Sequence, residues 1–311
     1  MRYRPDDVVA LLDSERPGES QDGFAIVATV EEGVALGATT ALVGVAPSGG
    51  RFPPAWRELL RETIRAGLDV ESGLHEFVSD DDELVALARE HRVELKDLRK
   101  PPPGLNVPTG GNLTHDARVI LTVGSDCAIG KMSVSLELDR EARRRGLASQ
   151  FVPTGQTGIA IAGWGIAVDA VVSDFIAGAA EQLVLEGVER GGRLLFVEGQ
   201  GSVLHPAYSG VTLGLIHGSA PHGYVLCHQS GLPFVEEDAR FPIPPLAELA
   251  DLHERLSLIP RRAPVLAIAL NTRLLDDAGA HEAILAAERE TGLPADDPVR
   301  FGGAKLLDAL V

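Results

Sequence analysis

Short apolar runs alternate with longer segments of mixed polarity along the first third of the chain. Residues 24–28 and 40–45 are apolar runs of strand length. Residues 54–66 place apolar side chains on one side of a helix that Gly67 ends. Three aspartates at residues 80–82 stand before another apolar series, where they suit a helix N-terminus. This alternation favours a parallel sheet covered by helices.

A proline-rich segment interrupts the pattern. Residues 101–103 are three successive prolines, and several glycines follow them. Such a segment continues neither a helix nor a central strand. We therefore expect a domain boundary near residues 100–115, and we divide the chain into residues 1–110 and residues 111–311.

A second alternating series follows this boundary and again predicts a parallel sheet with helices. Its expected strands are residues 118–123, 148–152, 193–197, 223–227 and 264–270. Its expected helices are residues 131–145, 174–189, 245–256 and 281–291.

The composition agrees with a folded protein and narrows its partners. Hydrophobic residues make up 45% of the 311 residues, which suffices for buried cores and is too many for a disordered chain. The net charge of −17 argues against binding to nucleic acid or to an anionic membrane, because both require a basic surface. No apolar run reaches membrane-spanning length. We expect a small-molecule substrate instead.

Cysteine use and the first residues favour a cytoplasmic protein. Cys127 and Cys227 are too few for a disulfide framework or a Cys-rich zinc site, so we expect a reducing compartment. Residues 1–13 carry charges throughout and lack the apolar region of a signal peptide. We expect both thiols to serve packing, although a helix N-terminus can lower the pKa of a cysteine such as Cys127.

The most informative segment is a glycine-bounded loop after a predicted strand. The apolar residues 118–123 lead into Gly124, and the loop ends at Gly130 with Lys131 opening the next predicted helix. This is the context of a phosphate-binding P-loop, in which loop amides and the helix N-terminus face an anion. Lys131 adds a positive charge and is one of only four lysines. The alternative is an ordinary glycine-rich turn.

The loop departs from the usual P-loop pattern. Five residues instead of four separate the glycines, and Met132 follows Lys131 where Ser or Thr is usual. Ser133 is then a candidate magnesium ligand, or the loop binds phosphates without a tightly held metal. The candidate cofactor-binding residues here are Gly124, Ser125, Asp126, Cys127, Ala128, Ile129, Gly130, Lys131, Met132 and Ser133.

Two further polar segments follow predicted strands. Glu198 directly follows the strand 193–197, at the rim of the sheet where ligands bind, so it is a candidate base or magnesium ligand. A solvated loop glutamate is the alternative. Thr154, Gln156 and Thr157 offer hydroxyl and amide groups that suit hydrogen bonds to a polar substrate, although they also suit a turn-rich loop.

Histidines and one aspartate are further candidates for proton transfer. Four of the nine histidines lie within residues 205–228, at spacings that disfavour a zinc site. A histidine is the usual proton carrier near pH 7, and we place His205 in the site, with His217 and His222 as alternatives. Asp174 is either a catalytic residue or a cap of the following helix.

This second half resembles dethiobiotin-synthetase-like P-loop proteins. The resemblance rests on the long loop with its Gly-x-Asp start and on residues 197–201 at a strand end. It implies that Asn271, which follows the strand 264–270, contacts an adenine edge; without it, Asn271 is a turn residue. Arg240 and Arg273 are candidate partners for carboxylate or phosphate groups.

Nearly the whole chain resembles a two-domain family that includes D-glutamate N-acetyltransferases. The shared stretches are residues 46–50, 73–76, 124–132, 153–158, 198–201 and 205–206. The resemblance implies an α/β fold, with a Rossmann-like N-terminal domain followed by a P-loop NTPase-like domain built on a parallel sheet.

The same resemblance implies an N-acyltransferase that moves an acetyl group from acetyl-CoA to the amine of an acidic amino acid, D-glutamate in the named members. The P-loop would hold the CoA phosphates, and Glu198 or a histidine such as His205 would take the amine proton. Arg240 and Arg273 would bind the substrate carboxylates. From the base rate for such enzymes we expect a homo-oligomer.

A second function class stays open at this stage. In an ATP- and magnesium-dependent kinase or ligase of the dethiobiotin-synthetase type, Lys131 would stabilise the transferring phosphoryl group, and Glu198 and Ser133 would hold the metal. Met132 in place of Ser or Thr weakens this reading. A non-catalytic nucleotide sensor is a third class, which the histidine- and glycine-rich loops at strand ends disfavour.

Overall fold

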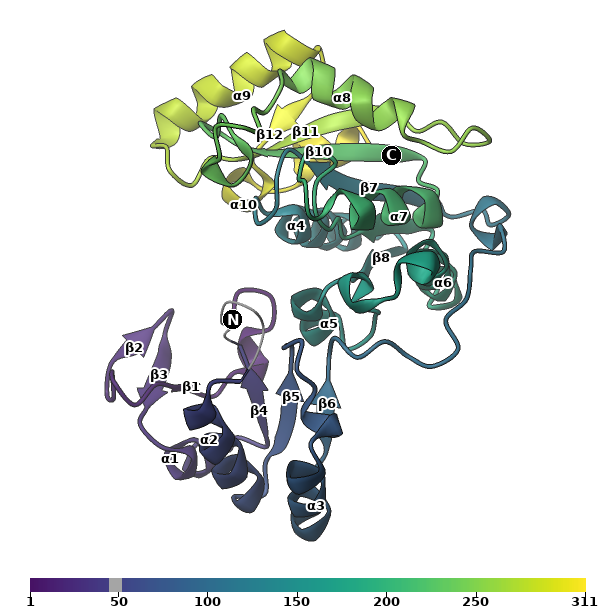
Figure 1. Cartoon of the computed structure of the whole chain (residues 1–311). Coiled ribbons are helices and arrows are strands. Elements are labelled where there is room, and N and C mark those ends of the chain that lie inside the picture. The colour runs from purple at the N-terminus through teal and green to yellow at the C-terminus, as the bar shows by residue number, and fades with distance from the viewer. Residues whose placement is uncertain (45–51) are drawn as a thin grey trace. The chain divides into compact units, whose positions relative to one another are not determined.

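The chain forms two units, each with its own sheet and core. The computed structural model describes residues 1–44 and 52–311, and its contacts separate Met1–Lys100 from Pro101–Val311 (Figure 1). The shared stretch 46–50 lies outside the described residues, and so does the last residue of the predicted strand 40–45.

The N-terminal unit contains a parallel three-stranded sheet with the order β4-β5-β6. Helices α2 and α3 pack on it through a small apolar core that includes Ile64, Val70 and Leu84. Its elements are β4 (Thr40–Val43), α2 (Pro54–Arg65), β5 (Asp69–Ser72), a 3-10 helix (Val78–Asp80), α3 (Asp82–His91) and β6 (Leu95–Asp97). The aspartates before α3 act as the sequence suggests, because Asp81 accepts hydrogen bonds from the backbone amides of Glu83 and Leu84.

A second small sheet precedes these elements, with the order β1-β3-β2. Strands β1 and β3 are parallel, and β2 and β3 are antiparallel. The elements of this part are a 3-10 helix (Pro5–Asp7), β1 (Leu11–Leu12), β2 (Ser20–Gln21), β3 (Phe24–Val27) and α1 (Val30–Ala35).

The C-terminal unit is built on a six-stranded sheet with the order β12-β11-β10-β7-β9-β8, and every pair is parallel. The first strand, β7, is central: the chain passes to β8 at one edge, returns to β9 beside β7, and then continues to β10 on the other side. This switch opens a crevice at the carboxyl end of β7, where ligands bind in such sheets. The strands are β7 (Arg118–Gly124), β8 (Ser149–Val152), β9 (Leu194–Val197), β10 (Gly223–Gln229), β11 (Val265–Asn271) and β12 (Ala295–Asp296).

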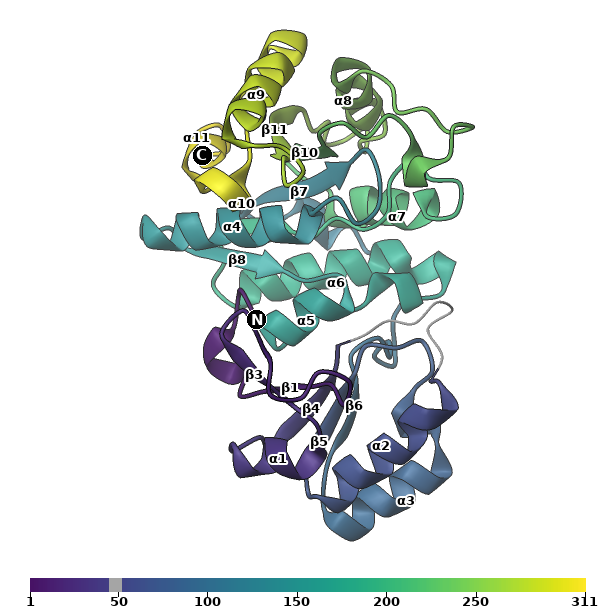
Figure 2. The ribbon, with the colours of Figure 1, turned by 90° about the vertical axis from the view of Figure 1, so that its left-hand side faces the viewer.

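Helices cover both faces of this sheet (Figures 1 and 2). One core lies under α6, α7, α8 and α9, and the other lies under α4 and α11. The helices are α4 (Lys131–Arg144), α5 (Gln156–Ala162), α6 (Ile176–Glu189), α7 (Ser209–Ser219), α8 (Leu246–Arg255), α9 (Asp277–Thr291), α10 (Pro298–Phe301) and α11 (Ala304–Asp308), with further 3-10 turns at Gly111–Leu113, Val168–Ala170, Ser173–Phe175 and Val235–Glu237.

The apolar runs predict these strands well, and two helices fall where the sequence suggests loops. Helix α5 begins inside the stretch 153–158, and α7 lies among the histidine-rich residues. Helix α7 is rich in small and apolar residues around its circumference, so it lacks the polar face that marks an amphipathic helix. Helix α9 begins four residues before its predicted start, because Asp276 accepts a hydrogen bond from the Gly279 amide.

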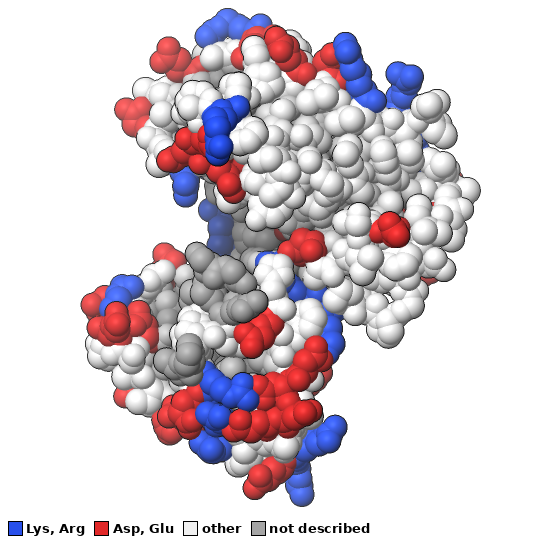
Figure 3. All heavy atoms as spheres, in the orientation of Figure 1, with Lys and Arg blue, Asp and Glu red and all other residues white. Residues whose placement is uncertain are grey.

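Acidic and basic side chains lie close together on the N-terminal unit in Figure 3. Ion pairs there link α2 to α3 through Arg57 with Asp81 and Arg61 with Glu83. Opposite charges that neutralise each other in this way leave no broad basic patch on the face that Figure 3 shows. Among the described residues, no helix has the length and apolar character that crossing a membrane requires.

Candidate active site

The glycine-bounded loop runs from Gly124, at the carboxyl end of β7, to Gly130, the N-cap of α4. Gly130 has φ 108°, and Ala128 also lies in the left-handed region with φ 52°, so the backbone turns sharply twice. Within the described part of the chain, the amides of Ala128, Ile129 and Gly130 have no protein acceptor. Free amides before a helix N-terminus are the physical requirement for binding an anion.

Lys131 is buried in the middle of this loop. Its Nζ donates a hydrogen bond of 2.6 Å to the backbone carbonyl of Asp126, and only 6% of the residue is exposed. Glycines leave room for its stem: a Cβ at Gly124 or Gly199 would lie 3.3 or 3.1 Å from Lys131 Cδ. Burial lowers the pKa of Lys131, against the opposing effect of nearby acidic groups that include Glu198. An anion bound at the loop would supply the counter-charge that this ammonium needs.

Glu198 is buried at the carboxyl end of β9, the strand beside β7. Its Oε2 accepts hydrogen bonds from the backbone amides of Thr154 at 2.9 Å and Gly155 at 3.2 Å. The Thr154 hydroxyl donates to the backbone carbonyl of Glu198 at 2.7 Å. The turn after β8 therefore fixes both the backbone and the carboxylate of Glu198.

Burial raises the pKa of Glu198 to about 7, although the amides of Thr154 and Gly155 and the charge of Lys131 lower it. A carboxylate with such a pKa is ionised in part of the molecules at neutral pH and can also hold a proton. General bases are effective when their pKa lies near the working pH. The surroundings of Glu198 thus bring the pKa of this acid–base group close to neutral pH.

The predicted substrate-binding residues differ in their positions. Thr154 is fully buried against Glu198, Gln156 opens α5 and is half-buried, and Thr157 is exposed on that helix. Close approach of the turn to Glu198 depends on two glycines, since a Cβ at Gly155 or Gly158 would contact its carboxylate oxygens. Thr154 therefore holds Glu198 in place, while the side chains of Gln156 and Thr157 are available to a ligand.

His205 and Glu236 meet Asp126 of the loop. The Asp126 carboxylate accepts hydrogen bonds from the backbone amides of Cys127 at 2.6 Å and Glu236 at 2.7 Å. His205 is buried, and its Nε2 lies 3.0 Å from Glu236 Oε1. Glu236 has φ 49°, a left-handed conformation that is costly for a residue with a side chain. Two separate loops thus meet the P-loop here, one with His205 and one with Glu236.

Two more side chains brace the loop from neighbouring strands. Asn271 Nδ2 donates to the Ile129 carbonyl at 3.1 Å, and its Oδ1 accepts the Arg273 amide at 3.2 Å. Ser125 Oγ and His228 Nδ1 share a hydrogen bond of 2.9 Å. The ends of β10 and β11 therefore hold the conformation of the P-loop.

A P-loop in the centre of a parallel sheet, preceded by a Rossmann-like unit, matches two family models. Residues 106–307 match the P-loop domain described as a domain of unknown function, DUF1611_C. Residues 14–101 match the Rossmann-like domain DUF1611_N. The chain belongs to the DUF1611 family. The predicted family resemblance and the predicted fold class are thereby confirmed.

Relatives of this DUF1611 chain have been assigned an activity. It is 36% identical over 309 residues to a D-glutamate N-acetyltransferase from Tritonibacter scottomollicae, covering 99% of this chain and 91% of the relative. It is 36% identical over 272 residues to a protein of the same name from a Pseudoalteromonas species, covering 87% and 81%. The chain is therefore an enzyme that resembles D-glutamate N-acetyltransferases.

A solved structure supports the fold of the whole DUF1611 chain. The crystal structure of a DUF1611 family protein from Anabaena variabilis superimposes with a TM-score of 0.91 at 41% identity. The match covers 97% of this chain and 90% of that chain.

Metal binding by the DUF1611 site can be judged from its donor atoms. Asp126, Cys127 and His205 place possible ligand atoms within 4.8 Å of one another. However, His205 Nδ1 accepts a hydrogen bond from the Ala207 amide at 3.1 Å, so the proton of a neutral ring lies on Nε2. Burial raises the pKa of Cys127 to about 11, so its thiol keeps its proton at neutral pH. In this arrangement both Asp126 carboxylate oxygens and His205 Nδ1 already accept backbone hydrogen bonds.

Magnesium ligation by Ser133 and Glu198 stays a prediction. Both lone pairs of Glu198 Oε2 are occupied by backbone amides, which leaves one oxygen for any further partner. Ser133 lies in the first turn of α4, one residue beyond the usual hydroxyl position that Met132 takes.

The remaining candidates lie at the periphery of the DUF1611 site. Arg240 is exposed and paired with Asp238, whereas Arg273 is exposed at the end of β11. Asp174 is exposed within the 3-10 turn before α6, and its side chain caps no helix among the described residues. His222 precedes β10, at the amino edge of the sheet, because its amide donates to Val119 at the start of β7. It is thus far along the strands from the P-loop.

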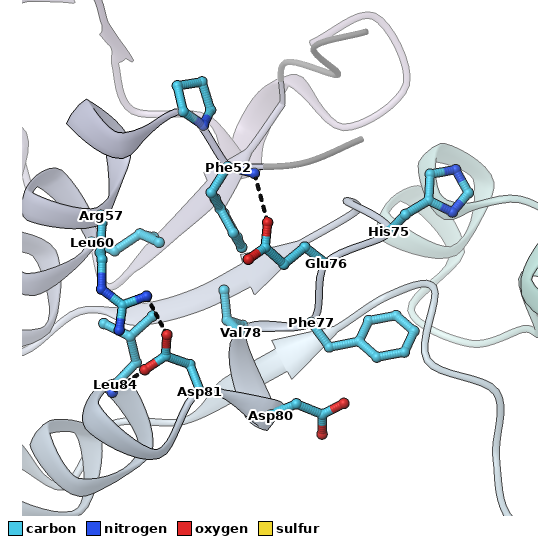
Figure 4. A pocket seen from close by; sticks show the side chains of 11 residues that line it. Phe52, Arg57, Leu60, His75, Glu76, Phe77, Val78, Asp80, Asp81 and Leu84 are labelled. Carbon is cyan, nitrogen blue, oxygen red and sulfur yellow. Dashed lines mark hydrogen bonds and ion pairs between the residues drawn. The ribbon is translucent and has the colours of Figure 1, made fainter. Parts of the chain in front are cut away.

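The N-terminal unit has a pocket of about 440 Å³ that includes His75 and Glu76 of the shared stretch 73–76 (Figure 4). Glu76 accepts a hydrogen bond from the Phe52 amide at 3.0 Å. Arg57 is paired with Asp81 across the pocket, whereas His75 points away from both (Figure 4). The charged groups inside this pocket already have protein partners.

Two residues that face the site were not predicted from the sequence. Gln200 donates to Glu198, and Glu236 contacts both Asp126 and His205. Gln200 lies within the shared stretch 198–201, and that stretch was the signal that could have identified it. Glu236 follows β10 in an acidic run that reads as a solvated loop, and only the fold brings it to the P-loop.

Proposed function

We propose that this DUF1611 chain transfers an acetyl group from acetyl-CoA to the amine of an acidic amino acid, with D-glutamate as the first acceptor to test. The observation that carries the proposal is Glu198, a buried carboxyl with a pKa of about 7 beside the P-loop lysine. The names of the two curated relatives support the reaction class.

The reaction requires a base, because an amino acid carries an ammonium group at neutral pH. Attack by the free amine forms the C–N bond and breaks the thioester C–S bond. The ammonium loses two protons: one ends on the CoA thiol, and one is released to solvent. In our proposal Glu198 takes a proton from the amine, and its pKa matches this task at neutral pH.

The loop 124–130 and Lys131 bind an anionic part of the acyl donor in this proposal. Their free amides and buried ammonium suit the phosphates of CoA. Ser133 and Met132 complete the first turn of α4 beside this loop.

Recognition of the acceptor is assigned to polar groups that are at least partly exposed at the same edge of the sheet. Gln156 and Thr157 offer hydrogen bonds, and Arg273 offers a cation for a substrate carboxylate. Arg240 would first have to exchange Asp238 for a substrate carboxylate.

One experiment separates this proposal from ATP- and magnesium-dependent chemistry. The purified protein is incubated with acetyl-CoA and D-glutamate, and separately with ATP, magnesium and D-glutamate, while release of CoA and of ADP is followed. CoA release that depends on D-glutamate and needs no ATP supports acetyl transfer. ADP release that depends on the amino acid, without CoA release, would refute it.

A further inference from the structure

Gln200 is the only side chain among the described residues that donates a hydrogen bond to the Glu198 carboxylate. Its Nε2 lies 3.3 Å from Glu198 Oε1, while Oε2 takes the amides of Thr154 and Gly155. The two carboxylate oxygens of Glu198 therefore have different partners. Backbone amides hold Oε2, whereas Oε1 faces a side-chain amide that can rotate.

The backbone of Gln200 is held in place. The Thr212 hydroxyl of α7 donates to the Gln200 carbonyl at 2.7 Å. Gly155 provides the space for the Gln200 amide, since a Cβ at Gly155 would overlap Nε2. These contacts fix where the amide lies but leave its last torsion free.

A proton taken up by Glu198 has one place to go. Both lone pairs of Oε2 accept backbone N–H groups, which cannot turn away, so the proton must bind Oε1. An O–H there would face the N–H of Gln200, and two donors repel. Rotation of the amide by half a turn replaces Nε2 with Oε1 of Gln200, which accepts the O–H. Within the described residues no donor holds Gln200 Oε1, so this rotation breaks no other protein hydrogen bond.

We propose that Gln200 is a positioning residue that follows the protonation of Glu198, donating to the carboxylate and accepting from the acid. The proposal rests on the proposed function of Glu198 as the base. An amide is the neutral side chain that can do both with one rotation. The base then keeps a partner before and after it takes the amine proton.

Substitutions of Gln200 separate this role from simple packing. Gln200→Met keeps the length of the side chain but removes both the donor and the acceptor. Both hydrogen bonds are lost, and the one to the charged carboxylate is the stronger, so the acid limb of the pH–rate profile should rise by about one pH unit. Gln200→Glu should raise it further, because two neighbouring carboxylates disfavour ionisation. Gly155→Ala places a Cβ where the Gln200 amide now lies and should shift the limb in the same direction.

The experiment measures pH–rate profiles for the wild type, these variants and Gln150→Met, a control on β8 whose side chain bonds Arg143 and Arg190 instead. The Glu198 carboxyl is also titrated directly by 13C NMR with labelled glutamate, its signal being the one that Glu198→Gln removes. An upward shift in Gln200→Met, absent in Gln150→Met, is the expected result. A Glu198 titration midpoint that stays at its wild-type value in both Gln200→Met and Gly155→Ala would overturn the proposal.

The two readouts keep the two proposals apart. If the wild type transfers no acetyl group, the proposed function fails, while the NMR titration still decides the role of Gln200. If transfer occurs and the titration does not respond to Gln200, only the positioning role fails.

Discussion

Gly158 stands directly against the carboxylate of Glu198, so that a Cβ at this position would overlap Oε2. Gly158 lies inside α5 with ordinary helical backbone angles. Alanine is favoured over glycine in helices by about 1 kcal/mol, so the backbone gives no reason for a glycine here. The reason lies across the turn, in the space that the buried carboxylate occupies.

Gly158→Ala should therefore lower kcat while leaving the fold intact. Displacement of a base by even a fraction of its van der Waals radius is expected to cost about 10- to 100-fold in rate. Gly210→Ala is the matched control, because Gly210 is also helical and a Cβ there meets nothing within 4 Å. Steady-state rates and circular dichroism of the two variants provide the check. Equal rates in both variants would contradict the placement of Glu198 at the reacting atoms.

Glu198→Gln should remove most of the activity. Loss of a general base typically costs 10²- to 10⁴-fold, and we expect a loss in about this range. In the wild type the rate should rise with pH through the region of 7, since the carboxyl must be ionised to accept a proton. The variant should lose this acid limb. A pH–rate profile that keeps the limb in Glu198→Gln would assign it to another group.

The same substitution should stabilise the protein at alkaline pH. The folded-state pKa of Glu198, about 7, lies above its ordinary value of 4.5, so folding favours the protonated form. The contribution of Glu198 to stability is then greatest at low pH and falls as pH rises from 4.5 to 7. Glu198→Gln lacks this loss and should be more stable by about 3 kcal/mol at pH 8. Urea unfolding at pH 5 and pH 8 measures the difference, which should be small at pH 5.

Lys131→Ala should weaken binding of the acyl donor. A charged hydrogen bond is worth about 1.5–3 kcal/mol, which corresponds to an affinity loss of about 10- to 100-fold. Isothermal titration with CoA measures this, with Lys305→Ala as the control because Lys305 pairs with Glu288 at the surface. Unchanged CoA affinity in Lys131→Ala would contradict the proposal that the P-loop binds the acyl donor.

His222 should make the fold sensitive to acid. Burial lowers the pKa of His222 to about 4, with help from the charge of Arg261, and its Nδ1 accepts the Val119 amide at 3.0 Å. The folded state favours the neutral ring, so the contribution of His222 to stability is present above pH 6.5 and is lost as pH falls toward 4. His222→Gln should flatten this dependence in thermal melts between pH 7 and pH 4. His281→Gln, at an exposed position, should leave it unchanged.

The strands and the P-loop were predictable because local pattern determines them. Apolar runs of strand length marked every long strand of the C-terminal sheet, and the glycines with Lys131 marked the turn after β7. The helical repeat of apolar and polar residues did not predict α5 or α7. In α5, Gly158 leaves space for the Glu198 carboxylate instead of following a helical pattern, and α7 lacks a polar face.

The side-chain geometry of the site could not be read from the chain. Thr154 and Glu198 are 44 residues apart, and Asp126 and Glu236 are 110 apart, so only the strand order brings them together. Burial sets the pKa of Glu198, and burial is a property of the finished fold. Asn271 illustrates the limit: the resemblance implies an adenine contact, which stays a prediction, and only the fold shows that its side chain also braces Ile129 of the P-loop.

That brace has a thermodynamic consequence. Asn271 ties the loop to β11 through the Ile129 carbonyl, and Ser125 ties it to β10 through His228. The conformational entropy of the loop is therefore lost when the protein folds, before any ligand arrives. A ligand that meets an already ordered loop loses less of its binding free energy to ordering the protein. Without the Asn271 amide, the loop would be ordered only when the ligand binds, and the loss of its conformational entropy would then weaken binding.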